Sequence, residues 1–375
     1  MSREYQICTR CIMDTSDPDI TFDEHGHCNH CIKVETTIKP RWHPNAAGEE
    51  QLKNIVREIK AAQGSNQYDS IIGLSGGVDS SYLLYIAKTK LGLNPLAVHV
   101  DGGWNSDEAV SNIENLTKKL GVDLYTIVVN WEEMKDLQLA FLNASVANQD
   151  VPQDHAFFAG LYSFSVKYKI RHVLNGSNFA TESILPPSWG YNAMDSKYIL
   201  DIHKKFGQRK LKTFPIVSFC KRYIYYPYIR KMQIIKPLNY MYYNKDQAIE
   251  VLEKELGWKY YGGKHHESRF TKFFQTYYLP KKFGFDKRRA HLSSLVVSGA
   301  MTRADALSEM NKEPYDKNTI VSDMEFVAKK LGIRPDELQA LMEKPNKMYY
   351  DYKSNDALIR FALAVRRRLS FLIKH

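Results

Sequence analysis

A glycine-rich turn after a short apolar run constrains the fold of this chain most strongly. The run 70–74 (SIIGL) leads into 75–81 (SGGVDSS), and a largely apolar stretch, 82–88, follows directly. A strand that turns at a glycine pair into a helix points the unpaired N–H groups of the first helical turn at a ligand, with the helix dipole behind them. We therefore predict a phosphate-binding turn, because two flanking hydroxyls and a carboxylate exceed what an ordinary strand-to-helix connection requires.

Strand-like and helix-like segments alternate through the next hundred residues. We expect strands at 71–74, 95–100, 123–129 and 172–175, the last of which completes the set, with a helix at 106–120 and helical segments up to residue 169. This alternation predicts a doubly wound α/β fold with a parallel sheet, whose ligands bind at the carboxyl ends of the strands. The loops 75–81, 100–106 and 175–183 fall at that edge.

Four of the five cysteines form two CxxC pairs separated by sixteen residues. They are Cys8, Cys11, Cys28 and Cys31. This spacing predicts a closed, structural zinc site that clasps a segment too short to build its own core. Disulfides and an iron–sulfur cluster are the alternatives. The neighbouring His25, His27 and His30 are expected to face solvent or to support the ligands, although one of them replacing a cysteine stays open.

Composition is that of a water-soluble enzyme. The 375 residues are 44% hydrophobic, no apolar stretch approaches the length of a membrane span, and the first residues lack a signal-peptide core, so we expect a cytoplasmic protein. The formal net charge of +10 favours polyanionic partners, either nucleotide-linked substrates or RNA.

Positive charge and aromatic rings concentrate in residues 259–289. This stretch holds nine Lys or Arg residues and only two acidic ones. A groove lined in this way grips a diphosphate or an RNA backbone, whereas the alternative is a solvated basic helix face with its aromatic rings packed inward. We expect Lys264, His265 and Arg269 to act in catalysis, with His266 and Lys272 binding substrate.

The turn 75–81 resembles the PP-loop of the ATP pyrophosphatase superfamily, whose fold is adenine nucleotide alpha hydrolase-like. The resemblance implies that ATP is cleaved between its α and β phosphates, that AMP passes to a substrate oxygen, and that Asp79 contacts Mg²⁺ while also serving catalysis. The ATP or pyrophosphate binders implied or expected at the three loops are Ser75, Gly76, Gly77, Asp79, Ser80, Ser81, Asp101, Gly176 and Asn178. An ordinary turn remains the alternative for Asp101.

A narrower resemblance rests on five segments taken together. CTRCIMD, SGGVDSS, DGGWNS, NGSNFATES and the stretch 262–289 are similar to the N-acetyl sugar amidotransferases of bacterial surface-polysaccharide and nonulosonic-acid pathways. The resemblance implies that an acetamido group on a nucleotide-linked sugar becomes an acetamidino group, and that a separate class I glutaminase subunit supplies ammonia. Glu182 is expected to bind substrate or position a metal, with a solvated loop carboxylate as the alternative.

A tRNA-thiolating ATP pyrophosphatase is the rival function. Such chemistry needs reactive cysteines near ATP, and only Cys220 remains once a metal takes the other four. Cys220 also lacks the surroundings of a glutamine-hydrolysing nucleophile, and we expect it to be a small buried hydrophobe. We therefore expect neither a nucleic-acid partner nor a glutaminase active site within this chain.

Helices are expected to dominate the C-terminal part, at 302–310, 319–331, 335–343 and 355–374. In the last helix, apolar residues recur at spacings of three and four, which predicts one buried stripe. Its members are Leu358, Phe361, Val365, Leu369 and Leu372, while the run 366–368 (RRR) is expected to face solvent. Together these features predict a zinc segment at 1–45, a PP-loop core at 46–185, a substrate-binding region at 186–300 and a helical region at 301–375.

Overall fold

A five-stranded parallel sheet forms the centre of the molecule. The computed structural model describes residues 4–263 and 267–373, with side chains up to residue 365. The strands are β1 (Ser70–Gly73), β2 (Pro95–Asp101), β3 (Leu124–Val128), β4 (His172–Leu174) and β5 (Gln233–Ile235). Their order is β3-β2-β1-β4-β5 and every neighbouring pair is parallel, which confirms the predicted doubly wound fold. The order reverses between β1 and β4, the position where such sheets bind ligands.

The prediction that the strand at 172–175 completes the sheet was wrong. β5 pairs with β4 in register from His172–Gln233 to Leu174–Ile235 and closes the edge of the sheet. The strand is only three residues long and largely exposed, so it carries neither the apolar run nor the alternation that marks a strand in sequence.

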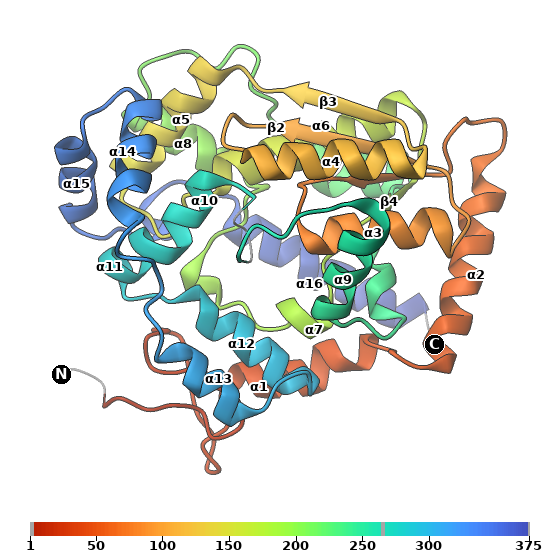
Figure 1. Cartoon of the computed structure of the whole chain (residues 1–375), viewed down its shortest axis with the longest axis horizontal. Helices are drawn as coiled ribbons and strands as arrows, with labels where there is room; N and C mark the ends of the chain where they lie inside the picture. Colours follow the sequence, from red (N-terminus) through yellow and green to blue (C-terminus); the bar gives the residue numbers. More distant parts are fainter. Residues whose placement is uncertain (1–3, 264–266, 374–375) are drawn as a thin grey trace.

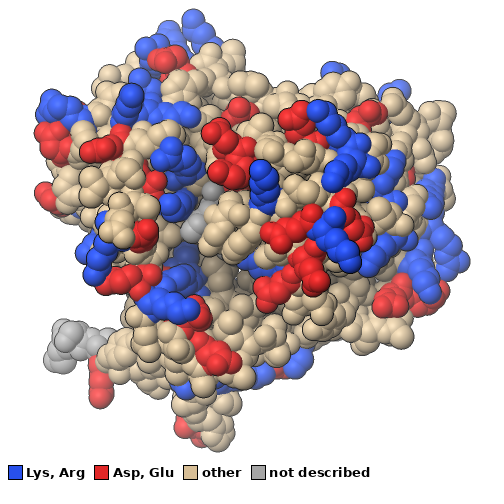
Figure 2. All heavy atoms as spheres, viewed as in Figure 1, with Lys and Arg blue, Asp and Glu red and all other residues tan. Residues whose placement is uncertain are grey.

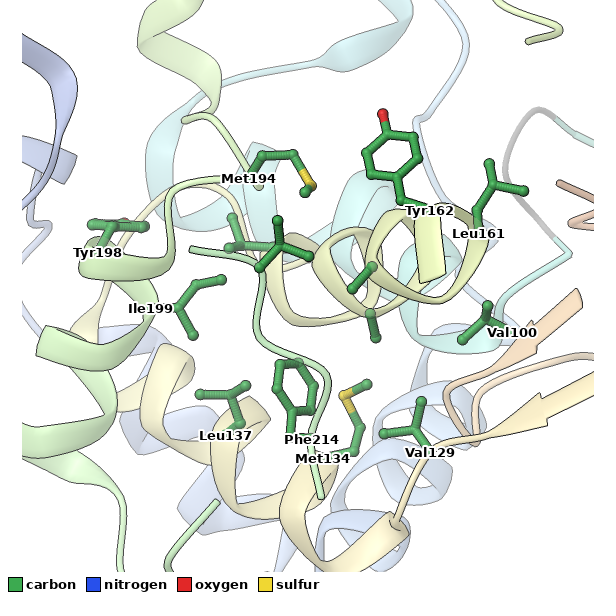
Figure 3. Close-up of a cluster of buried hydrophobic side chains, with 14 of the residues drawn as sticks. Val100, Val129, Met134, Leu137, Leu161, Tyr162, Met194, Tyr198, Ile199 and Phe214 are labelled. Carbon is green, nitrogen blue, oxygen red and sulfur yellow. The ribbon is translucent and has the colours of Figure 1, made fainter. Parts of the chain in front are cut away.

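Helices cover both faces of the sheet (Figure 1). Ile71 belongs to one hydrophobic cluster and its neighbour Ile72 to the other, because successive side chains of a strand point to opposite faces. The Ile71 face packs on α5 (Trp131–Ala144), α6 (Val151–Lys167) and α8 (Ser196–Phe206). Figure 3 shows side chains of this cluster, with Met134 and Leu137 of α5 lying near Phe214. The Ile72 face packs on α2 (Ala46–Gln63), α3 (Val78–Thr89), α4 (Asp107–Leu120) and α9 (Lys245–Leu256).

A third hydrophobic cluster joins the beginning of the chain to its C-terminal helices. All four clustered cysteines lie in it with side chains from α10, α11, α12, α14 and α15. The elements of this unit are α1 (Asn29–Lys33), α10 (Arg269–Phe273), α11 (Leu279–Phe283), α12 (Lys287–Ser298), α13 (Arg303–Met310), α14 (Ile320–Leu331) and α15 (Pro335–Glu343). The short helix α7 (Phe179–Glu182) connects this unit to the sheet. The helices expected at 302–310, 319–331 and 335–343 are thereby confirmed.

The last helix, α16 (Asp356–Ile373), forms where expected but does not bury its predicted stripe. Leu358, Phe361 and Val365 are 47%, 67% and 38% exposed, and Ile359 is the buried residue instead. The spacing predicted an amphipathic helix correctly, but the described chain offers no surface that covers this face. The side chains of Leu369, Leu372 and the run 366–368 lie outside the described part.

Across residues 4–263 and 267–373, we find no helix with both the length and the apolar character needed to cross a membrane.

Candidate active site

The glycine turn has the geometry of an anion cradle. Gly76 adopts a φ of +84°, and a Cβ there would lie 2.8 Å from the carbonyl oxygen of Ala109. Gly77 is the N-cap of α3, and its N–H donates to the Ser75 hydroxyl at 3.2 Å. The hydroxyls of Ser75 and Ser80 lie 3.3 Å apart across the turn. The turn therefore presents hydroxyls and a helix N-terminus to one side, as phosphate binding requires.

The loop after β4 closes onto the first turn of α3. A Cβ on Gly176 would stand 3.0 Å from the backbone carbonyl of Asp79, so a larger residue would crowd this approach. Asp79 Oδ1 accepts a hydrogen bond from Asn178 Nδ2 at 3.3 Å and a short one from the Tyr243 hydroxyl. Burial and the neighbouring Asp79 carboxylate raise the pKa of Tyr243, which stays a hydrogen-bond donor. The position of Asp79 is thus fixed by two elements outside its own helix.

The loop after β2 contacts His99, a residue of β2 that lines the cavity. His99 Nδ1 donates to the carbonyl oxygen of Leu74 at 2.8 Å, and its Nε2 lies 2.9 Å from Asn105 Nδ2. Asn105 also donates to Asp101 Oδ1 at 3.0 Å. Asp101 accepts a further bond from the N–H of Gly103, so its carboxylate shapes this loop.

The segment that opens α10 pairs with the same loop. Ser106 N donates to Glu267 O at 2.8 Å, Arg269 N donates to Trp104 O at 2.9 Å, and Asn105 and Ser268 form an antiparallel bridge. This pairing carries Glu267 over the PP-loop. A Cβ on Gly77 would lie 3.0 Å from Glu267 Oε1 and 3.3 Å from the Tyr261 hydroxyl.

These loops surround a cavity of about 510 Å³, a size suited to a nucleotide or other small ligand. Among the described residues, its walls carry five carboxylates and two lysines, together with His99 and His291. The carboxylates are Asp79, Asp150, Asp154, Glu182 and Glu267, and the lysines are Lys245 and Lys287. Figure 2 likewise shows acidic and basic side chains interspersed over this face of the molecule. The described walls thus differ from the predicted basic groove.

The carboxylate of Asp150 connects the start of α6 to the C-terminal helices through hydrogen bonds. Asp150, at the start of α6, accepts hydrogen bonds from Gln153 at 3.3 Å and from Thr271 of α10 at 3.0 Å. Its other oxygen accepts from Gln275 at 3.4 Å. Asp150 is 7% exposed and lines the cavity, so it presents a fixed set of polar groups to a ligand.

The structure brings most of the predicted loop residues together. Ser75, Gly77, Asp79, Ser80, Gly176 and Glu182 line the cavity. Gly76, Ser81, Asp101 and Asn178 lie behind it and support the loops. Lys264, His265 and His266 lie outside the described residues.

Arg269 and Lys272 are not where catalysis or substrate binding was expected. Both form ion pairs with Asp323 of α14, at 3.4 and 2.9 Å, and neither belongs to the cavity wall. The guanidinium of Arg269 also lies 3.5 Å from the ring centre of Phe326. The two cations therefore share one carboxylate at the interface between α10 and α14.

Several cavity residues escaped the sequence reasoning. In the cavity wall they are His99, Asp150, Gln153, Asp154, Lys245, Tyr261 and His291, and beside the wall Tyr243 bonds to Asp79. His99 lies within the apolar strand β2, where the pattern predicts a core residue. Only its position near the carboxyl end of β2 could have indicated a site residue. Glu267 and Lys287 counted only as charges of the basic stretch. Tyr243 and His291 reach the site through long-range contacts that no local pattern reveals.

The four predicted cysteines converge on one point. Their ligand atoms lie within 4.8 Å of one another, with Cys8–Cys31 and Cys11–Cys28 Sγ distances of 3.9 and 3.7 Å. Four sulfurs at about 2.3 Å from a tetrahedral ion lie about 3.8 Å apart, so the set fits a single metal ion.

The nearby histidines are not needed as ligands. Among them, His30 is buried and contacts Asp17 at 2.6 Å, while His25 is exposed to solvent. Cys220, which was expected to be buried, is exposed instead.

Comparison with known proteins matches two parts of the chain to different families. Residues 49–216 match the family described as NAD synthase, so the chain carries a PP-loop domain of the ATP pyrophosphatase superfamily. Residues 267–366 match the family described as LPS biosynthesis protein WbpG-like, C-terminal domain. The chain therefore joins a NAD synthase-like PP-loop domain to a WbpG-like C-terminal domain.

Individual relatives match this chain over part of its length or at low identity. An uncharacterized protein of Methanocaldococcus jannaschii is 38% identical over 96 residues, 25% of this chain and 33% of that protein. A glutamine-hydrolyzing GMP synthase of Thermosipho africanus is 23% identical over 205 residues, 53% of this chain and 34% of that protein. The chain thus spans about a third of the length of these curated relatives. The solved structure of an NH3-dependent NAD synthetase from Campylobacter jejuni is 16% identical, covering 80% of this chain and 97% of that one with a TM-score of 0.34.

Proposed function

We propose that this protein is an ATP-dependent amidotransferase that converts the acetamido group of an N-acetylated, nucleotide-linked sugar into an acetamidino group during surface-polysaccharide synthesis. One observation carries the proposal. The cavity lies between loops of the NAD synthase-like domain and side chains of the WbpG-like domain, among them Glu267, Lys287 and His291. An ATP-cleaving loop therefore faces a wall from a domain whose family description names lipopolysaccharide biosynthesis.

The chemistry follows from the two walls. In the proposed reaction the amide oxygen attacks the α-phosphorus of ATP and pyrophosphate leaves. Ammonia then adds to the activated carbon, a proton is lost, and AMP departs with the former amide oxygen. Ser75, Ser80 and the N-terminus of α3 would hold the leaving pyrophosphate, and Asp79 would hold Mg²⁺, which prefers oxygen ligands. Roles for Lys264, His265 and His266 remain predictions.

Ammonia would come from a separate class I glutaminase subunit in the cytoplasm. Within the described residues, no cysteine lines the cavity, so none is placed to hydrolyse glutamine beside the activated carbon. The same observation weighs against tRNA thiolation, which needs a reactive sulfur at the ATP site. For the cysteine cluster we propose a structural zinc ion, because four sulfurs leave no open coordination position.

The decisive test supplies the purified protein with ATP, Mg²⁺, an ammonium salt and diacetamido nucleotide-sugars. Mass spectrometry should show the small mass decrease that replacement of oxygen by NH causes, with AMP and pyrophosphate formed in equal amounts. Asp79→Asn should abolish turnover while ATP still binds. Release of ADP would reject the superfamily mechanism, and thiolated tRNA in a parallel reaction with sulfide would establish the rival function.

A further inference from the structure

Helix α12 has two polar faces that contact different parts of the molecule. Lys287 and His291, four residues apart, line the cavity. Arg289 and Ser293 have the same spacing but are displaced by two residues, and two residues correspond to about 200° around a helix. The second pair therefore points away from the cavity, toward the N-terminal cysteine segment, and both residues contact it.

The contacts with the cysteine segment are buried and specific. Arg289 Nη1 donates to Ile12 O at 2.7 Å, and its Nε lies 3.1 Å from the buried carboxylate of Asp14. Ile12 N donates to the Ser293 hydroxyl at 3.2 Å. From the start of α13, Arg303 donates to Cys8 O at 2.8 Å and to Cys11 O at 2.9 Å. The guanidinium groups of Arg289 and Arg303 thus donate hydrogen bonds to backbone carbonyl groups of the turn that carries the first CxxC pair.

Helix α12 is also connected to the PP-loop, through α7 and the residues beside it. Ile184 N donates to the Ser294 hydroxyl of α12 at 2.9 Å, and the Ser298 hydroxyl donates to Ala180 O at 3.2 Å. Ala180 belongs to α7, whose N-cap is Asn178, the residue that bonds to Asp79. Figure 1 shows α12 between α7 and α13.

We propose that the metal-filled cysteine cluster positions α12, and that Arg289 and Arg303 are the positioning residues through which it sets Lys287 and His291 in the acceptor-binding wall of the cavity. The four cysteines hold their turn in one conformation only while an ion gathers the sulfurs. Without the ion, the carbonyl groups of Cys8, Cys11 and Ile12 lose their fixed places. The assignment of the wall to the acceptor rests on the proposed function, whereas the coupling of the cysteine cluster to α12 does not.

Hydrogen exchange tests the coupling independently of activity. The full chain is measured as the zinc-loaded protein, after chelator treatment, and after zinc is restored. We expect peptides from α12 and α7 to exchange faster in the stripped protein and to recover with zinc, while peptides from α8 on the far side of the sheet stay unchanged. Unchanged exchange of α12 while the cysteine segment opens would overturn the proposal.

Substitutions test the link to the acceptor. We expect Arg289→Ala to retain its zinc and its ATP affinity but to raise the KM for the sugar about tenfold, the scale of effects seen when groups supporting a metal site are removed. Arg289→Lys should recover part of that loss, and Arg334→Ala, which removes an exposed arginine that pairs with nearby Asp336 and Glu337, is the control. Equal changes in the KM values of ATP and sugar would contradict the positioning role. If the unsubstituted protein forms no amidine, the proposed function fails and hydrogen exchange alone decides the coupling.

Discussion

Gly76 shows how a single residue sets the geometry of the site. Its positive φ disfavours a side chain, and its close contact with Ala109 of α4 leaves little room for one beside the phosphate-binding turn. Gly299, which ends α12, shares the positive φ of +80° but has no atom near the position of a Cβ. The two glycines therefore separate the effect of backbone conformation from the effect of crowding.

We predict that Gly76→Ala destabilises the protein more than Gly299→Ala does. Both variants carry the cost of a left-handed residue, about 1–2 kcal/mol, and only Gly76→Ala adds crowding worth about 1–3 kcal/mol. Urea denaturation gives the two free energies of unfolding, and calorimetry should show weaker ATP binding only for Gly76→Ala. Equal losses of stability and unchanged ATP binding would show that the crowding is relieved elsewhere.

Glu133 anchors a loop by its charge. This buried carboxylate of α5 accepts backbone hydrogen bonds from Lys212, Thr213 and Phe214, at 2.7 to 3.1 Å. Burial alone raises the pKa of Glu133, but the backbone donors outweigh it and the net pKa is lowered. The ionised form therefore stabilises the fold at pH values above the unfolded pKa of about 4.3, and that contribution is lost as the pH falls through the lower folded pKa.

Replacing this charge should have a pH-dependent cost. We expect Glu133→Gln to lower the free energy of unfolding by about 2–3 kcal/mol at pH 7. The amide has one acceptor oxygen, and its NH₂ group would face backbone N–H donors that the second carboxylate oxygen now accepts. The difference from the unsubstituted protein should narrow below about pH 4. Chemical denaturation at several pH values measures it, and a difference that stays constant with pH would mean that the carboxylate is not ionised in the fold.

Residues of the PP-loop were predictable because the glycines, hydroxyls and carboxylate that form the cradle are adjacent in sequence. Tyr243 and Glu267 were not, because each reaches the loop from more than 150 residues away through contacts that only the fold creates. Arg269 shows the converse. Its charge suggested phosphate binding, but its guanidinium pairs with Asp323 of α14 at 3.4 Å.

Elements were predictable where periodicity was strong. The helices at 303–310, 320–331 and 335–343 follow their caps and apolar spacing, whereas the three-residue strand β5 has too few residues to display a period. Periodicity also cannot say what a helix face contacts. In α16 it predicted a buried stripe, and Ile359, not Phe361, is the residue that the fold buries.

Two substitutions on α16 test this orientation. We expect Ile359→Ser to lower the free energy of unfolding by about 2–4 kcal/mol, because it removes a buried side chain and buries a hydroxyl. Phe361→Ser should change stability by no more than about 0.5 kcal/mol, as exposed positions do. Thermal denaturation compares the two, and a larger loss from Phe361→Ser would place the predicted stripe inside after all.

At the scale of the whole molecule, the first and last parts of the sequence share one hydrophobic cluster. Cys8 and Cys31 share a hydrophobic cluster with Phe270, Leu331 and Leu338. The beginning of the chain and its C-terminal helices therefore stabilise one another.

Deleting residues 1–45 should accordingly damage the C-terminal helices more than the sheet. We expect limited proteolysis to cut between residues 267 and 343 much faster in the shortened protein, while fragments that contain β1 to β4 stay resistant. The missing segment would leave the apolar residues of the third cluster exposed to water. Equal resistance of both parts would show that the C-terminal helices hold together alone.

The hydrogen bond from Ile12 to Ser293 joins residues 281 positions apart. During synthesis at roughly 5–20 residues per second, the cysteine segment therefore emerges from the ribosome about 15 to 60 s before its partner on α12 exists. An ion captured early would give this segment a fixed shape during that wait, and would protect its thiols from oxidation until the rest of the polypeptide arrives.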